Sequence, residues 1–265
     1  MAAPGPIDRQ LSSTDPALRK ESIADRRESF IADVYKSLDV EKKTEKPFLA
    51  ENVTQYQADK LKALFEKYYD VDKDGVITEK DIESLNEKFV DFTGWSATDR
   101  KLQTLLEYHR DLYKCLLMEI NKDVHVEEQK TSEITLGAWM RMWDRIMKGA
   151  LALGHLPQWV QVMPYNLFSY IDKTGDGHIT KQHLLEFYTD FMLIDDKRGK
   201  IVADNAWTQM TGNGDFKLTL ELYTMSFSNF LFGRSFYGPG LFILGTFREC
   251  SERIPFKIIP PTVED

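Results

Sequence analysis

Between about residues 53 and 248, apolar side chains recur every three or four positions, the spacing of helices that bury one face and expose the other. In the first such stretch the apolar positions are Leu61, Leu64, Phe65 and Tyr68. Comparable stretches follow at 82–89, 102–116, 139–147, 167–171, 184–192, 202–210 and 220–232. The strict alternation of apolar and polar residues that marks strands is almost absent. The pattern therefore predicts an all-α protein.

Four polar segments with a common frame lie between the predicted helices. Each is a polar loop followed by an aliphatic residue, a threonine and a new helix, and the four are DVDKDGVITEKD (70–81), EEQKTSEITLGA (127–138), DKTGDGHITKQH (172–183) and TGNGDFKLTLEL (211–222). Carboxylates at alternate positions with glycine at the sixth, as in the first segment, are typical of the calcium loop of an EF-hand. In that motif the eighth residue forms a short bridge to a paired loop, so an apolar residue persists there even where ligands are lost. The repeat predicts four EF-hand motifs in two paired lobes that form one compact body.

The change in composition along the chain predicts four parts. Residues 1–50 contain several prolines, a Ser/Thr cluster and mixed charges, which are typical of a flexible extension. An N-terminal EF-hand pair is expected at 51–155 and a C-terminal pair at 156–248, followed by a tail at 249–265.

The extension contains two strings of basic residues followed by a serine. LRKESI and DRRESF place Ser22 and Ser29 in contexts that resemble acceptor sites of basophilic kinases. Phosphate there would add negative charge beside the neighbouring arginines. A solvated, charged tail is the alternative interpretation.

The first loop carries the full pattern of hard oxygen ligands. Asp70, Asp72 and Asp74, the backbone carbonyl of Val76 and the carboxylate of Asp81 are the predicted ligands. Four converging carboxylates repel one another, so a bound cation would stabilise the loop. Aspartate at the twelfth position, instead of glutamate, reaches less far and favours a mixed Ca²⁺/Mg²⁺ site.

The third loop keeps only part of this ligand set. Asp172, Thr174 and Asp176 with the carbonyl of His178 could form a weak or lost site, because His183 replaces the carboxylate at the twelfth position. An alternative is a zinc or copper site made by Asp172, Asp176 and His183.

The other two loops lack the residues that a hard cation needs. The second has Glu127 but also Ser132 at the turn position and Ala138 at the twelfth. The fourth has Phe216 and Leu222 at the corresponding two positions. Both are expected to be empty scaffolds.

Composition narrows the classes of partner. Hydrophobic residues make up 42% of the 265 positions, enough for a core, and the net charge of −8 argues against nucleic acid or an anionic membrane surface. No run of about 18 apolar residues occurs, so no transmembrane segment is expected. Cys115 and Cys250 alone cannot form a disulfide framework. These features predict a cytoplasmic monomer with an unidentified protein target.

Several stretches together resemble a known family. They are FTGWSATDRKLQTLLEYH (92–109), AWMRMWDRIMK (138–148), the third-loop start DKTGDGHIT and the segment GPGLFILGTF (238–247). With the aspartate that ends the first loop, they make roughly residues 55–248 resemble the sarcoplasmic calcium-binding proteins, a group that includes the calexcitins and the insect juvenile hormone diol kinases. The resemblance implies a four-EF-hand body whose lobes pack face to face and in which two or three loops bind metal.

The function expected from the loops and the resemblance is binding of Ca²⁺ or Mg²⁺, as a buffer or a sensor. One alternative, implied by luciferin-binding relatives, is a hydrophobic-ligand pocket, with core packing as the other explanation of the five tryptophans. A second alternative is a kinase of a sesquiterpenoid diol, suggested by the family name alone. The pair Gly199–Lys200 does not belong to a P-loop, and no catalytic arrangement of residues is apparent, so no enzyme is expected.

Overall fold

The computed structural model describes residues 50–123, 131–234 and 237–246. The chain divides into two compact units, Met1–Leu49 and Ala50–Asp265. The predicted flexible extension with Ser22 and Ser29, and the predicted tail at 249–265, lie outside the described residues.

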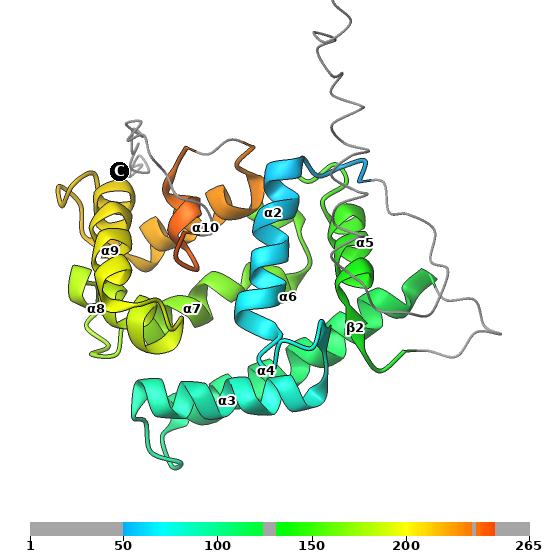
Figure 1. The fold of residues 1–265 in the computed structure, drawn as a ribbon, viewed down its shortest axis with the longest axis horizontal. Coiled ribbons are helices and arrows are strands. Elements are labelled where there is room, and N and C mark those ends of the chain that lie inside the picture. Colours follow the sequence, from blue (N-terminus) through cyan, green and yellow to red (C-terminus); the bar gives the residue numbers. More distant parts are fainter. Residues whose placement is uncertain (1–49, 124–130, 235–236, 247–265) are drawn as a thin grey trace, which may run out of the picture. The chain divides into compact units, whose positions relative to one another are not determined.

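Four helix–loop–helix units follow one another in the second unit (Figure 1). Their helices are, in order, α2 (Gln55–Leu64) with a π-helical turn (Phe65–Tyr69) and α3 (Glu79–Thr93); α4 (Arg100–Ile120) and α5 (Leu136–Ile146); α7 (Met163–Ile171) and α8 (Lys181–Glu186) with a π-helical turn (Phe187–Phe191); and α9 (Asp196–Thr211) and α10 (Leu220–Phe232). Short helical turns occupy Asn121–Asp123, Leu153–His155, α6 (Gln158–Gln161) and Pro239–Phe242. The predicted all-α class is confirmed.

The loops are joined in two pairs by short antiparallel strands. The first pair consists of β1 (Val76–Ile77) and β2 (Ile134–Thr135), the second of β3 (His178–Ile179) and β4 (Leu218–Thr219). Ile77 faces Ile134 and Ile179 faces Leu218, and all four side chains are fully buried at 0% exposure. The apolar eighth position of each loop is thus the contact between loops, and the two paired lobes are confirmed.

The threonine at the ninth position begins the next helix. The hydroxyls of Thr135, Thr180 and Thr219 accept the backbone N–H three residues later, at 3.2, 3.1 and 3.5 Å. Such N-caps satisfy one of the free N–H groups at the start of a helix, typically worth about 1 kcal/mol. The threonine therefore persists for helix initiation, independently of metal binding.

Aromatic side chains from the two EF-hand pairs meet in a common core. Phe89 of α3 lies 4.6 Å from Phe191 and 4.3 Å from Tyr170, measured between ring centroids. The hydroxyls of Tyr68 and Tyr170, from the first and third units, share a short hydrogen bond. Ring contacts of this kind add to the burial of apolar area, so the core ties the two pairs together.

Three tryptophans form a second series of ring contacts. Trp139 and Trp143 are 0% exposed and meet edge to face at 5.7 Å, and Trp159 lies 5.8 Å from Trp143. The indole N–H of Trp139 donates to the carbonyl of Leu61 at 3.0 Å. These contacts support core packing as the role of the three rings.

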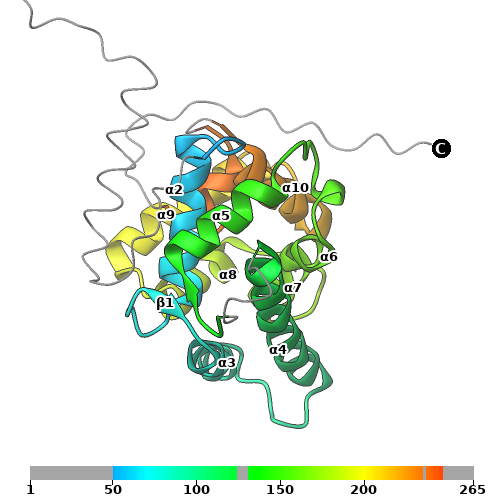
Figure 2. The same ribbon diagram turned by 90° about the vertical axis from the view of Figure 1, so that its right-hand side faces the viewer.

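Helix α2 packs against both α5 and α10 (Figures 1 and 2). Gln57 donates to the carbonyl of Leu231 at 3.0 Å, and the ammonium of Lys60 donates to the carbonyl of Gly233 at 2.8 Å. The last carbonyls of α10, which have no partner within their own helix, are thus satisfied by side chains of α2. Lys60 is 1% exposed, and burial lowers the pKa of its ammonium to about 7.

Among the described residues, no helix combines the length and the apolar character that crossing a bilayer requires.

Candidate metal centre

Three carboxylates of the first loop gather at one point. Asp70, Asp72 and Asp74 each place one carboxylate oxygen within 4.8 Å of the others. Gly75 follows with a φ of +89°, a conformation that glycine adopts without strain and that turns the loop back on itself. Asp70 is 4% exposed at the end of the π-helical turn, whereas the other two carboxylates are exposed.

The two oxygens of Asp70 have different environments. Oδ2 accepts the N–H of Gly75 at 3.1 Å, but Oδ1 is buried and has no hydrogen-bond partner among the described residues. Burial, and after it the charges of Asp74 and Asp81, raises the pKa of Asp70 above its ordinary value, against the opposing effect of its backbone hydrogen bonds. A buried carboxylate oxygen without a partner is costly, and a hard cation at this point would remove that cost. The residues present therefore fit Ca²⁺ or Mg²⁺.

Asp81 lies apart from the three gathered carboxylates and holds the loop backbone. It is 1% exposed, and its Oδ1 accepts the N–H groups of Val71 and Asp72 at 3.0 and 3.4 Å. Its Oδ2 accepts both the N–H and the hydroxyl of Thr78 at 2.9 and 2.8 Å. From the first turn of α3, one carboxylate thus fastens the start of the loop to its end. The remaining predicted residue, Val76, donates its N–H to Asp74 at 2.9 Å.

Replacing Asp81 with alanine is expected to destabilise the metal-free protein by about 3 kcal/mol, because several buried or half-buried donors lose their acceptor at once. Urea unfolding in the presence of a chelator measures this loss. The matched control is His183→Ala in the third loop, where Nδ1 accepts a single N–H within the described residues, that of Thr180 at 3.3 Å. If Asp81→Ala lowers the free energy of unfolding no more than His183→Ala does, Asp81 does not hold the loop backbone as described.

The third loop has the same turn, but none of its buried carboxylate oxygens lacks a hydrogen-bond partner. Asp172 is 3% exposed, and its Oδ1 accepts the hydroxyl of Thr174 at 3.1 Å and the N–H of Gly175 at 3.0 Å. Its Oδ2 accepts the N–H of Gly177 at 2.9 Å. One oxygen of the exposed Asp176 carboxylate, Oδ1, accepts the N–H of His178 at 3.2 Å and lies 2.8 Å from Nδ1 of the same residue. The loop closes on its own hydrogen bonds.

His183 takes over part of the task that a carboxylate has in the first loop. Its Nδ1 accepts the N–H of Thr180 as Asp81 accepts that of Thr78, so the ring supports helix capping. Within the part of the chain that the structure describes, Asp70, Asp72 and Asp74 form the only group of three acidic, histidine or cysteine residues close enough to share an ion. The zinc or copper alternative at His183 therefore gains no support from the geometry.

The second and fourth loops are held by uncharged groups. In the fourth, the hydroxyl of Thr211 accepts the N–H of Gly214 at 2.8 Å and so substitutes for an aspartate without its charge. In the second, the side chain of Asn121 binds both backbone groups of Thr131, at 2.9 and 3.0 Å. Ala138 lies in α5, while Glu127 lies outside the described residues.

Residues considered for chemistry other than metal binding have structural roles. Gly199 and Lys200 lie inside α9, where a side chain at Gly199 would meet the methyl group of Thr189. His109 is 1% exposed with Nδ1 2.6 Å from the amide oxygen of Asn86, and burial lowers the pKa of its ring to about 3.

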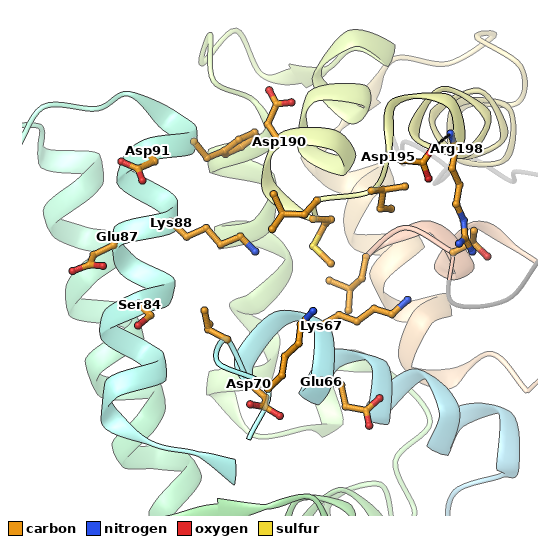
Figure 3. A pocket seen from close by; sticks show the side chains of 18 residues that line it. Glu66, Lys67, Asp70, Ser84, Glu87, Lys88, Asp91, Asp190, Asp195 and Arg198 are labelled. Carbon is orange, nitrogen blue, oxygen red and sulfur yellow. Dashed lines mark hydrogen bonds between the residues drawn. The ribbon is translucent and has the colours of Figure 1, made fainter. Parts of the chain in front are cut away.

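Sequence reasoning missed a cleft beside the first loop, lined by both acidic and basic side chains, among them Lys67, Lys88 and Arg198 (Figure 3). These residues lie in three separate elements, so no local pattern signals that they converge.

The chain is similar to proteins that are named sarcoplasmic calcium-binding proteins. No protein-family model matches the chain. Sarcoplasmic calcium-binding proteins I, III and IV of Branchiostoma lanceolatum are 24% identical over 143 residues, which is 53% of this chain and 73% of theirs. Proteins II, V, VI and VII of the same organism are 23% identical over the same length and shares. The solved structure of a sarcoplasmic calcium-binding protein from amphioxus superposes with a TM-score of 0.60 at 18% identity, covering 73% of this chain and 98% of that one.

Proposed function

Since the chain is an EF-hand protein of the sarcoplasmic calcium-binding protein type, we propose that it binds one divalent cation, Ca²⁺ in competition with Mg²⁺, in loop 70–81. The observation that carries the proposal is the buried, unpartnered Oδ1 of Asp70 beside the carboxylates of Asp72 and Asp74. The carbonyl of Val76 and the carboxylate of Asp81 would complete the ligand set.

The short side chain of Asp81 limits the affinity for calcium. Both of its oxygens already accept backbone N–H groups, so they would have to be shared with an ion. Ca²⁺, which needs six to eight oxygen ligands, loses more affinity from this sharing than Mg²⁺, which binds six ligands and keeps several waters. We therefore expect weakened preference for Ca²⁺ over Mg²⁺.

The third loop is proposed to bind weakly or not at all. Both oxygens of Asp172 and one oxygen of Asp176 are engaged within the loop, and the hydroxyl of Thr174 and the backbone carbonyl of His178 add no negative charge to them. A cation would have to displace these hydrogen bonds without gaining a carboxylate at the twelfth position.

Buffering is the role that the core favours over sensing. An EF-hand sensor opens its helix pairs to expose an apolar groove. Here Phe89 and Phe191 are 0% exposed in a core shared by both pairs, and the bond from Tyr68 to Tyr170 crosses between them. Opening one pair would expose these rings. A cytoplasmic, monomeric, non-enzymatic buffer is the proposed role.

The experiment is a calorimetric titration with Ca²⁺, repeated in Mg²⁺, on the parent and on two matched variants. Asp74 and Asp176 both hold the fifth loop position and both accept the N–H two residues later, at 2.9 and 3.2 Å. We expect one Ca²⁺ per chain, a loss of affinity of about tenfold or more in Asp74→Asn, and unchanged binding in Asp176→Asn. Two equivalent sites in the parent, or the reverse ranking of the variants, would refute the assignment.

A further inference from the structure

Two neighbouring hollows form one elongated groove on the surface of the four-unit body. The larger, a cleft of about 840 Å³, opens beside the first loop between the π-helical turn after α2, α3 and the segment 192–195 that leads into α9 (Figure 3). The smaller, of about 330 Å³, lies along α9. Asp195, Arg198 and Thr246 line both, so the two hollows are continuous. An elongated groove suits a stretch of extended polypeptide.

The larger hollow carries charges of both signs. Figure 3 shows Lys67 and Lys88 extending into it from two different helical segments. Among the described residues that line it are four cations, Lys67, Lys73, Lys88 and Arg198, and six carboxylates, Glu66, Asp70, Glu87, Asp91, Asp190 and Asp195. Because carboxylates outnumber cations, an occupant with a few positive charges of its own is favoured over an anion.

The groove also exposes apolar surface. Val71, Met192 and Ile194 line the larger hollow together with Leu193, which is 74% exposed. Ile201 lines the smaller hollow and is 55% exposed. Apolar side chains surrounded by charged ones are the usual arrangement of a surface that another polypeptide covers.

The described part of the chain ends at this groove. The hydroxyl of Tyr188 donates to the carbonyl of Phe242 at 2.6 Å. Gly245, with a φ of +72°, packs so closely that a side chain there would come within 2.6 Å of Cδ1 of Ile194. These contacts hold the segment before Thr246 in place, and Thr246 itself lines both hollows. The polypeptide that follows therefore starts at the groove.

The sequence that follows has the chemistry that the groove calls for. Residues 247–265 lie outside the described residues, and their sequence includes RIPFKIIPPTV at 253–263. This segment has two cations, Arg253 and Lys257, and no carboxylate. Its large apolar residues are Ile254, Phe256, Ile258, Ile259 and Val263. Its prolines restrict the unfolded backbone, which lowers the conformational entropy that the segment would lose on docking.

The connection from Thr246 is long enough for this segment to enter the groove. Seven residues separate Thr246 from Arg253, and at roughly 3.3 Å per residue they can span about 23 Å. Covalent attachment also raises the effective concentration of the segment at the groove, so that individually weak contacts suffice for docking.

We propose that residues 253–263 of this chain dock in the groove and cover its apolar side chains. The apolar residues of the segment would lie on Leu193, Ile194 and Ile201, while Arg253 and Lys257 would lie among the carboxylates. The docked segment would keep other polypeptides out of the groove. The proposal does not depend on cation binding in loop 70–81.

The test is paramagnetic relaxation enhancement in the full chain. A nitroxide is attached at Thr262→Cys in a chain that carries Cys115→Ser and Cys250→Ser, with Ca²⁺ kept in excess so that loop 70–81 is in one state. We expect strong broadening of the amide signals of Ser84 and Lys88, which line the groove from α3. Phe256→Ser/Ile259→Ser should reduce this broadening about threefold or more, because two apolar side chains of the segment no longer gain from leaving water.

The matched control is Glu249→Gln/Glu252→Gln, which changes two residues of the same tail before the docking segment and should keep the broadening of the parent. Both double variants lie beyond Thr246, and the amide spectrum itself shows whether the helices are intact. A mixture of isotope-labelled chains without nitroxide and unlabelled chains with it detects docking between copies, and it should show no broadening at Ser84 and Lys88. The proposal is overturned if Phe256→Ser/Ile259→Ser leaves the broadening unchanged, if both double variants reduce it equally, or if the mixture shows it as strongly.

Discussion

Asparagine in place of Asp70 is expected to weaken Ca²⁺ binding on the order of a hundred-fold while raising the stability of the metal-free protein. The affinity falls because a full charge and an unshared oxygen are removed from the point where the carboxylates meet, and a hundred-fold loss corresponds to about 2.7 kcal/mol. The metal-free protein gains because its folded state no longer holds a buried charge next to Asp74 and Asp81. The amide oxygen can still accept the N–H of Gly75.

The matched control for this result is Asp172→Asn. Asp172 is equally buried and accepts the N–H of Gly177 in the same way, but both of its oxygens are satisfied within the loop. It should lose stability on substitution and leave the Ca²⁺ affinity of the protein unchanged. Calorimetry gives the affinity and urea unfolding in chelator gives the stability. Equal effects of the two substitutions on Ca²⁺ binding would show that the first loop is not the principal site.

The second large effect is a dependence of stability on pH that comes from Lys60. Its pKa is lowered from 10.5 to about 7 by burial, so between these values the unfolded chain holds a proton that the folded protein has released. Stability therefore rises with pH across this window and changes little from this group below it. Each pKa unit corresponds to about 1.4 kcal/mol, so the rise from pH 7 to pH 9.5 should reach several kcal/mol.

Lys60→Met tests this effect, because methionine keeps the length of the side chain but cannot titrate. The variant loses the hydrogen bonds to the carbonyls of Asn229 and Gly233, a cost that does not vary with pH. Urea unfolding at several pH values should give a flatter profile for Lys60→Met than for the parent. Lys62→Met, two residues along the same helix and outside the core, should keep the slope of the parent. If the free energy of unfolding of the parent protein does not rise between pH 7 and pH 9.5, Lys60 is protonated in the folded state throughout this range.

Much of the fold could be predicted because its signals are local and repeated. The aliphatic and threonine pair in each loop specifies a bridge and a helix start within a few residues. Ile134 and Thr135 therefore mark the second loop although it lacks the carboxylate at the twelfth position. The apolar stripes likewise predicted buried positions such as Leu85 and Phe89.

The metal loop was recognised as a pattern, but the task of each carboxylate could not be read from it. Their positions in the motif suggest that Asp70 and Asp81 are both metal ligands with the same role. In the structure, however, Asp81 holds the loop backbone through hydrogen bonds, whereas Asp70 has a buried oxygen without a partner. The same holds for Lys60, whose burial depends on α10, about 170 residues later in the chain. Contacts between distant elements, not composition, decide these roles.

The side chains of Gln57 and Lys60 donate hydrogen bonds to carbonyls at the end of α10. These bonds hold the first helix of the four units, α2, against the last, α10. Because α2 also leads, through the π-helical turn Phe65–Tyr69, into loop 70–81, a single helix links the metal loop to α10. The four units are in this sense a closed series: the first of their helices, α2, contacts the last, α10, without passing through the two middle units.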